Sequence, residues 1–314
     1  MNPVVLHGVA PLANLGVIRA DGPDAASFLH GQLTQDIVLL TATEARLAAL
    51  CTAKGRMIAS FVAVRPSPER VLLLVSADIL AQTLKRLSMF VLRAKVKLTD
   101  ATADYALYGL AGDAVAANGA DPEAGPGTRR CLAAPGSDES DAGVVALYPA
   151  DGVPRALWIG PVAGPAPSGE PLDPSTWAWS EVRSGVATVT LPTVEAFVPQ
   201  MLNYESVGGV NFKKGCYPGQ EVVARSQFRG TLKRRTYLVG ADASLAAGQE
   251  VFAGDDAEQP VGTVVQAAAA PEGGWSALVS LQVSAPGTGG LRAGSATGPA
   301  LRVEPLPYVL RDDI

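Results

Sequence analysis

The sequence predicts an α+β protein with a separate all-β module at its C-terminal end. Strand and helix patterns are interleaved before this module without a regular βαβ alternation, which favours α+β over a doubly wound fold. From Thr236 onward only short strand-like runs remain, separated by Gly, Pro and Asp, a pattern typical of a small β-barrel. A chain of 314 residues also exceeds the size at which a single core stops growing. We therefore expect two domains, residues 1–235 and 236–314.

The first hundred residues contain segments with clear apolar periodicity. Apolar residues at alternate positions indicate strands, and apolar residues three and four apart indicate helices. Lys54-Gly55-Arg56 separates two β-rich runs and predicts a hairpin between them. The expected elements are a strand over 14–20, a helix from Pro23 toward Leu33, a hairpin of 45–53 and 57–66, a strand over 71–77 and a helix over 77–92.

Two segments rich in Gly and Pro interrupt the rest of the chain. Residues 119–143 and 160–174 predict loops, the first with one short strand. A helix follows the second loop, with Ser175 as its N-cap and Gly185 at its end. The other expected elements are strands over 143–150, 154–160, 236–240, 249–254, 261–267, 276–281 and 300–306.

The composition excludes several classes of protein. Hydrophobic residues make up 48% of the chain and charged residues 18%, which argues against intrinsic disorder. We find neither a secretory signal pattern nor an apolar run of about 20 residues, so we expect a soluble, cytoplasmic protein without a membrane partner. The chain has 3 Cys without CxxC spacing and 2 His distant from them, which predicts neither a zinc site nor a disulfide framework. The absence of a P-loop and of a GxGxxG motif argues against nucleotide hydrolysis and Rossmann-type chemistry.

Residues 213–221, KKGCYPGQE, place Cys216 between two lysines and a tight turn. The turn is expected to lead into a helix, GQEVVARSQF, whose positive end faces the cysteine. Cations and a helix N-terminus favour the thiolate form, so the pattern indicates a reactive thiol more than a buried, inert one. A protease-like nucleophile would need a histidine base, for which only His7 and His30 exist.

The same region of the chain concentrates positive charge. Between residues 213 and 235 there are seven basic residues and one acid, a local charge of +6, although the whole chain carries −5. Such a concentration indicates an anionic ligand, which can be a carboxylate, a phosphate or RNA, although a solvated basic face gives the same pattern. The basic residues are Lys213, Lys214, Arg225, Arg229, Lys233, Arg234 and Arg235.

The segment FVPQMLNYESVGGVNFKKGCYPGQEVVARSQFRGTLKRR resembles the signature of the YgfZ family of folate-binding proteins, whose diagnostic core is K-G-C-Y-x-G-Q-E. DAASFLHGQLTQD, CTAKGRMIASF and EPLPY extend the resemblance over nearly the whole chain, and it is weakest between 105 and 175. The resemblance implies that Cys216 is a functional thiol. It also implies that the motif residues are Lys214, Gly215, Tyr217, Gly219, Gln220 and Glu221. The concentration of positive charge, independently of the resemblance, makes Arg225, Arg229, Arg234 and Arg235 candidates for anion binding.

The family is similar in fold to the aminomethyltransferase, or T-protein, of the glycine cleavage system. This likeness implies a ring of α+β lobes around a folate pocket, closed by a C-terminal β-barrel. It implies tetrahydrofolate or a folate derivative as the cofactor. It further implies a role in maintaining iron-sulfur enzymes, notably the radical enzyme that methylthiolates tRNA, with tRNA as an indirect partner and no role for DNA.

Two kinds of position define the expected folate site. Trp177 and Leu15 match folate-contacting positions of the family, and the Trp177 ring is suited to stacking on a planar ligand. Arg183 matches the glutamate that recognises the pterin ring in the transferase. A cation cannot accept ring N–H groups as a carboxylate does, so pterin recognition is expected to differ.

Ala59 and Ser60 stand where the transferase has its pair of aspartates. Without that carboxylate the folate adduct lacks an acid–base partner, so aminomethyl transfer is disfavoured. The leading hypothesis is therefore a folate-binding accessory protein for iron-sulfur cluster assembly or repair. The alternatives are a folate-dependent one-carbon transferase and a direct RNA-binding protein, whose affinity would fall steeply with salt.

Overall fold

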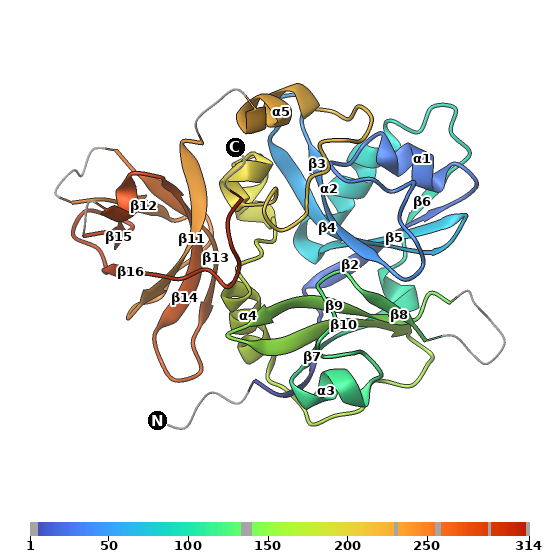
Figure 1. The fold of residues 1–314 in the computed structure, drawn as a ribbon, viewed down its shortest axis with the longest axis horizontal. Coiled ribbons are helices and arrows are strands. Elements are labelled where there is room, and N and C mark those ends of the chain that lie inside the picture. Colours follow the sequence, from blue (N-terminus) through green and yellow to red (C-terminus); the bar gives the residue numbers. More distant parts are fainter. Residues whose placement is uncertain (1–5, 133–139, 229–231, 255–258, 288–289, 312–314) are drawn as a thin grey trace.

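A computed structural model describes residues 6–132, 140–228, 232–254, 259–287 and 290–311. Three antiparallel sheets dominate the described chain, and two of them lie close together while the third stands to one side (Figure 1). The helices lie on the outer faces of the paired sheets and between these sheets and the third one. The α-helices are α1 (Ala25–His30), α2 (Ala77–Ser88), α3 (Asp113–Ala117), α4 (Pro174–Arg183) and α5 (Gln220–Phe228).

The first sheet has the strand order β1-β7-β10-β9-β8, and the second has the order β3-β4-β5-β2-β6. The first consists of β1 (Gly8–Pro11), β7 (Tyr105–Ala111), β8 (Arg129–Cys131), β9 (Gly143–Ala150) and β10 (Val153–Pro161). The second consists of β2 (Leu15–Asp21), β3 (Ala45–Cys51), β4 (Met57–Ser67), β5 (Arg70–Ser76) and β6 (Lys97–Asp100).

These two sheets share one apolar core. Side chains alternate between the faces of a strand, so each strand supplies one face to this core. On β10, Leu157 and Ile159 point toward the second sheet, whereas Ala156 and Trp158 pack on α3. On β4, Val64 belongs to the shared core, whereas its neighbour Ala63 packs on the side covered by α1 and α2. The space between the sheets is therefore apolar along most of its length.

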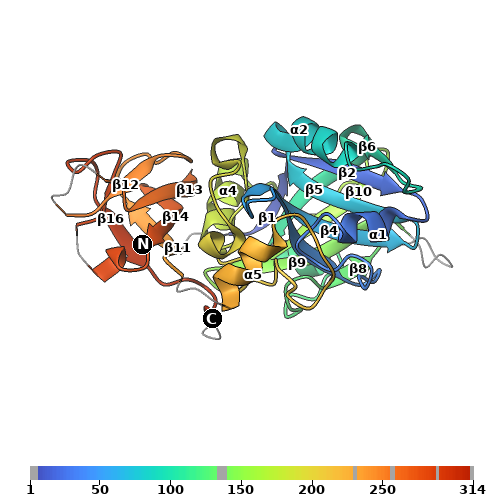
Figure 2. The ribbon, with the colours of Figure 1, turned by 90° about the horizontal axis from the view of Figure 1, so that it is seen from above.

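The third sheet is formed by the C-terminal strands in the order β15-β12-β13-β14-β11-β16, and it curls into a half-barrel. Its edge strands approach each other through a bridge between Arg292 and Ala300. Figure 2 shows α4 between this sheet and the rest of the molecule. The strands are β11 (Arg234–Ala241), β12 (Glu250–Phe252), β13 (Gly262–Ala269), β14 (Trp275–Gln282), β15 (Arg292–Ala293) and β16 (Leu301–Glu304).

The structure confirms the α+β class, the 54–56 hairpin, the short strand in the first loop and the all-β C-terminal module. The structure contains β1, β6, β7, β15 and α3 in addition to the elements that the sequence predicts. The boundary of the two predicted domains at residue 235 stays a prediction.

Three predicted helix details are wrong. The first helix ends at His30 because the backbone of Leu33 and Thr34 pairs with the second sheet instead. The helix predicted to run to residue 92 ends at Ser88, since the chain must turn to enter β6. The N-cap of α4 is Asp173, whose side chain accepts a hydrogen bond from the Ser175 backbone N–H at 2.7 Å, and Pro174 occupies the first helical turn.

Candidate functional site

A cavity of about 300 Å³ lies where the two five-stranded sheets meet α4. This volume is within the range of small-molecule sites in proteins. Its walls are mostly apolar, with Leu47, Val62, Leu74, Leu147 and Leu157 among them. We call it the central cavity.

Trp177 lies in the wall of this cavity, with 2% of its surface exposed. The guanidinium of Arg155 sits over the indole ring, with its carbon 4.3 Å from the ring centroid. The indole also rests against the first sheet, because a β-carbon at Gly109 would lie 2.4 Å from its Cδ2 and Cε2 atoms. A planar ligand can therefore stack on the face covered by Arg155 only by displacing the guanidinium or by lying on its outer side.

Among the described residues that line the cavity, Glu181 is the one carboxylate. It is four residues after Trp177 on α4, so both side chains lie on the same helix face. Part of its surface faces the cavity, yet protein surrounds it, and this desolvation raises its pKa. Arg155 and the Trp177 indole partly oppose the shift by favouring the ionised form.

Arg155 is almost completely buried, with 4% of its surface exposed. Burial lowers its pKa to about 10, and the Glu181 charge works against this decrease. The guanidinium donates one hydrogen bond, a long one of 3.4 Å to the Tyr148 carbonyl, while its Nε atom has no partner. The indole Nε1–H of Trp177 makes no hydrogen bond of good geometry, but it lies close enough to Glu181 to favour the ionised carboxylate. Arg155 Nε is therefore the buried donor of the cavity wall that is left unsatisfied.

Among the residues predicted for folate binding, Leu15 and Trp177 line the central cavity, but Arg183 does not belong to its described lining. Arg183 lies on the opposite side of α4, where it pairs with Asp151 at 2.7 Å and with Glu304 of β16. These carboxylates raise its pKa in spite of burial. Arg183 thus connects α4 to the C-terminal sheet.

The sequence interpretation missed Arg155 and Glu181. A signal for both was present in the sequence. Arg155 is a cation inside the otherwise apolar run PRALWIG, and Glu181 follows Trp177 at helical spacing, whereas Arg183 follows Trp179 at that spacing. Trp179 faces the C-terminal sheet and donates to Ser276 Oγ at 3.1 Å.

The Cys216 loop packs on the β3–β4 hairpin. Gly219 has φ +82°, and a β-carbon there would lie 2.3 Å from the Thr52 carbonyl oxygen and 2.8 Å from Gly55 Cα. Gly55 has φ +71° and approaches Val222 of α5 in turn. The two glycines therefore permit a contact that any larger residue would prevent. The predicted helix after the turn is confirmed as α5.

Lys214 attaches the Cys216 loop to the segment between α1 and the second sheet. Its ammonium group donates to the His30 carbonyl at the end of α1 and to the Leu33 carbonyl at 2.8 Å, and it lies over the Tyr217 ring. Burial lowers its pKa to about 8, although Asp36 and Cys216 oppose the shift. Lys214 is therefore engaged in holding the loop.

His30 and Asp36 lie beneath this loop. The Nδ1 atom of His30 is 3.1 Å from an Asp36 carboxylate oxygen, and its Nε2 atom is 3.5 Å from where a β-carbon of Gly215 would be. Burial opposes ionisation of Asp36, but the Leu39 backbone N–H and His30 outweigh it and lower the pKa of Asp36. The loop thus lies beside an oriented imidazole.

Cys216 is exposed, whereas Cys131 is half-buried and Cys51 is buried, and all three are free thiols. Burial raises the pKa of Cys51 to about 12. Within the part of the chain that the structure describes, no three His, Cys, Asp or Glu side chains lie close enough together to hold a metal ion. The described residues also contain no helix long and apolar enough to cross a membrane.

The predicted anion-binding arginines are separated in the structure. Arg225 pairs with Glu221 one helical turn away, at 2.6 Å. Arg234 donates to the Val261 carbonyl, and Arg235 donates to the buried carboxylate of Glu205 at 3.0 Å. Arg229 lies outside the described residues. Arg234 and Arg235 therefore hold the C-terminal sheet in place with these contacts.

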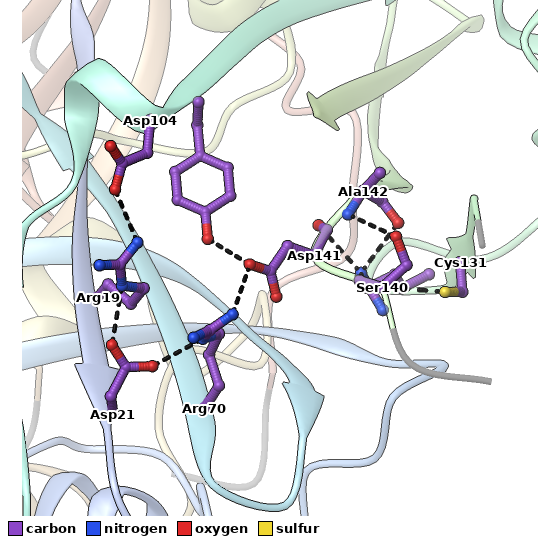
Figure 3. A network of polar contacts seen from close by, with 10 residues as sticks. Arg19, Asp21, Arg70, Asp104, Cys131, Ser140, Asp141 and Ala142 are labelled. Atoms are coloured by element: carbon purple, nitrogen blue, oxygen red, sulfur yellow. Dashed lines mark hydrogen bonds and ion pairs between the residues drawn. The ribbon is translucent and has the colours of Figure 1, made fainter. Parts of the chain in front are cut away.

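A second polar cluster, away from the central cavity, joins strands of the two sheets, and we call it the outer network (Figure 3). Its arginines are each shared between two carboxylates: Arg70 contacts Asp21 at 2.7 Å and Asp141 at 2.9 Å. The Tyr105 hydroxyl donates to the same Asp141 carboxylate. The members of the outer network are Arg19, Asp21, Arg70, Asp104, Tyr105 and Asp141.

Comparison with known proteins gives consistent results. A tRNA-modifying protein YgfZ from Edwardsiella ictaluri is 31% identical over 304 residues, which cover 93% of this chain and 89% of the relative. A protein of the same name from Klebsiella pneumoniae is 30% identical, with 93% and 90% covered. The crystal structure of the glycine cleavage system aminomethyltransferase T from Bartonella henselae superposes with a TM-score of 0.68 at 16% identity, covering 97% of this chain and 87% of that one. No protein-family model matches the chain. The predicted T-protein-like fold is confirmed.

Proposed function

The chain belongs to the YgfZ family of tRNA-modifying proteins, and on this premise we propose that it binds a reduced folate, tetrahydrofolate or a derivative, in its central cavity. We propose further that it supports iron-sulfur enzymes, such as the radical enzyme that methylthiolates tRNA. In this role Cys216 is the working thiol.

The observation that carries the folate proposal is the buried Arg155 Nε–H donor in the cavity wall, which has no partner and lies beside the Trp177 ring. Buried polar groups without partners are rare and costly, and they are commonly satisfied by water or ligands. A planar heterocycle offers an acceptor for this donor and an aromatic face for the apolar walls. The residues present therefore fit a folate ring, and Leu15 would contribute an apolar contact.

A bound tetrahydrofolate would supply ring nitrogens that can accept a one-carbon unit. The residues of this chain favour binding over aminomethyl transfer. Ala59 is buried in the core and Ser60 accepts a hydrogen bond from the Val189 backbone N–H at 2.9 Å, so neither provides the carboxylate of the transferase. We therefore propose an accessory protein without the aminomethyltransferase reaction.

The position of Cys216 supports its role as a thiol that reacts with partners. It is exposed on a loop that Lys214 and the contact between Gly55 and Gly219 hold in place. An accessible thiol can bind soft metal ions or exchange with disulfides, whereas a buried thiol such as Cys51 cannot.

Calorimetric titration with tetrahydrofolate tests the folate proposal. Trp177→Phe keeps most of the apolar volume but removes the Nε1–H donor, so it should weaken binding severalfold. Trp179→Phe is the matched control on the same helix, since Trp179 faces the C-terminal sheet, and it should bind as the wild type does. Absence of binding to the wild-type protein would refute the proposal.

A complementation assay tests the thiol. Cys216→Ser should fold normally yet fail to restore methylthiolated tRNA in cells that lack the native protein, whereas Cys131→Ser should restore it. Mass spectrometry after iodoacetamide treatment should show alkylation at Cys216 in the folded protein and at Cys51 only after denaturation, because burial raises the pKa of Cys51 to about 12. Full complementation by Cys216→Ser would mean that the thiol only shapes the loop.

A further inference from the structure

The central cavity contains one buried pair of opposite charges in otherwise apolar surroundings. Arg155 comes from β10 of the first sheet and Glu181 from α4, so two separate elements bring the pair together. Both charges are desolvated, which lowers the pKa of Arg155 and raises that of Glu181. Burying such a pair usually costs more than its mutual attraction returns. Stability alone therefore does not account for its presence.

The pair is also incompletely satisfied. No hydrogen bond joins the two side chains directly, and the Nε atom of Arg155 has no partner. The carboxylate of Glu181 faces a space that no described side chain fills, and the Trp177 indole beside it favours its ionised form. The end of the cavity thus offers a carboxylate acceptor next to the unpartnered Arg155 Nε–H donor.

We propose that Glu181 and Arg155 determine ligand specificity, with Glu181 accepting hydrogen bonds from adjacent N–H groups on the edge of a planar heterocycle. This inference rests on the proposed function, because it identifies the residues that would recognise the pterin ring of a folate. It places recognition at Glu181, whereas alignment with the transferase points to Arg183.

The chemistry of the two groups supports this division of roles. A carboxylate has two oxygens that can accept from two neighbouring N–H donors, such as the cyclic amide N–H and the amino group of a 2-amino-4-oxo pyrimidine edge. Arginine offers only donors and a flat face, so Arg155 can serve a ring oxygen or nitrogen and stack on the ring. The Trp177 indole backs the guanidinium on its other side.

The helix geometry explains why Arg183 cannot take this role. Residues four apart share a helix face, so Glu181 accompanies Trp177 into the cavity and Arg183 accompanies Trp179 toward the C-terminal sheet. Arg183 is already paired with Asp151 and Glu304.

Recognition by a carboxylate makes binding dependent on pH. Glu181 has a raised pKa, so it becomes protonated at a higher pH than an exposed glutamate, and a protonated carboxyl loses acceptor capacity. Affinity should therefore fall as pH decreases through this raised pKa. The other titratable groups that line the cavity are Arg46, Tyr148, Arg155 and Tyr204. Burial raises the pKa of both tyrosines and lowers that of Arg155 only to about 10, so these three groups keep their charge state below neutral pH.

The test compares Glu181→Gln with the wild type by calorimetry, using tetrahydrofolate, pterin alone and p-aminobenzoylglutamate as separate probes. The amide retains the size of the side chain but replaces one acceptor oxygen with a donor. Affinity for tetrahydrofolate and for pterin should decrease at least about tenfold, and affinity for p-aminobenzoylglutamate should not change. The loss of affinity toward low pH should disappear in the variant. Glu250→Gln, an exposed position on β12, is the control and should behave as the wild type.

The outcomes separate this inference from the function on which it rests. If the wild type binds tetrahydrofolate and Glu181→Gln binds it equally well with the same pH profile, the role of Glu181 is refuted while the folate site stands. If Arg183→Gln instead loses affinity for tetrahydrofolate, the pterin ring is recognised at the position that alignment with the transferase indicates, and the role of Glu181 is also refuted. If the wild type binds none of the probes, the proposed function itself fails.

Discussion

The molecule contains two clusters in which an arginine, a carboxylate and an aromatic residue meet. In the outer network, Arg70, Asp141 and Tyr105 join the two sheets, and each contact is a short hydrogen bond. In the central cavity, Arg155 and Glu181 meet beside Trp177, yet the Nε–H donor of the arginine remains unpartnered. The same residue types therefore serve different purposes. Where the hydrogen bonds are complete, the cluster holds the fold together, and where they are incomplete and face a cavity, the cluster indicates a ligand site.

Exposure supports the same distinction. The Arg70 side chain is 38% exposed, so water shares in its solvation and the cost of its charge is small. Arg155 is 4% exposed, so water does little to solvate its buried charge. Selection for stability alone would favour apolar residues in place of Arg155 and Glu181.

The largest expected effect follows from removing both charges of the cavity. Arg155→Met with Glu181→Gln eliminates the buried pair without leaving either charge alone, so stability should not decrease. Affinity for tetrahydrofolate should fall about a hundredfold, because two polar contacts to the ligand are lost. Urea unfolding and calorimetry measure the two quantities. A marked loss of stability together with unchanged affinity would show that the two clusters have the same structural role.

The second prediction concerns the outer network. Arg70→Met removes contacts to Asp21 and Asp141, so it should lower the free energy of unfolding by about 1 kcal/mol, a value reduced by the partial exposure of Arg70. Affinity for tetrahydrofolate should remain at the wild-type value. Arg225→Met breaks a highly exposed pair on α5 and serves as the control, with little change in stability. An effect of Arg70→Met on folate binding would contradict the separation of the clusters.

The smallest effect expected is a difference in salt dependence. Exposed charges are screened strongly between 0.1 and 1 M salt, where the Debye length falls from about 10 to about 3 Å. The stability difference between the wild type and Arg70→Met should shrink over this range. The affinity for tetrahydrofolate, which we assign to the Arg155–Glu181 pair, should change by less than about twofold over the same range. If the affinity and the stability difference depended equally on salt, the ligand would have to lie on an exposed surface.

Local patterns predicted those parts of the fold that depend on neighbouring residues. The glycine hairpin and the C-terminal strands follow from turn residues and apolar runs, and the structure confirms them. The strand β7 could not be recognised with the same ease, because YALYGLA lacks polar residues that would distinguish a central strand from a buried helix. The contact between Gly55 and Gly219 depends on tertiary packing and has no local signal.

The candidate site was predictable in part. Trp177 and Leu15 follow from the family resemblance, and the structure places both in the wall of one cavity. Glu181 could be found only by asking which residues share a helix face with Trp177. Aligning the chain with the transferase residue by residue leads instead to Arg183, two positions later. The burial of Arg155, by contrast, depends on how Trp177 of α4 packs against its guanidinium, which a single sequence does not reveal.

A crystal structure of the protein with tetrahydrofolate tests the central claim most directly. We expect the pterin ring in the central cavity, with its N–H edge at the Glu181 carboxylate and Arg155 against its face. The outer network should be unchanged and free of ligand. A ligand bound at the outer network or at the Cys216 loop, with an empty central cavity, would refute the assignment of the central cavity as the folate site.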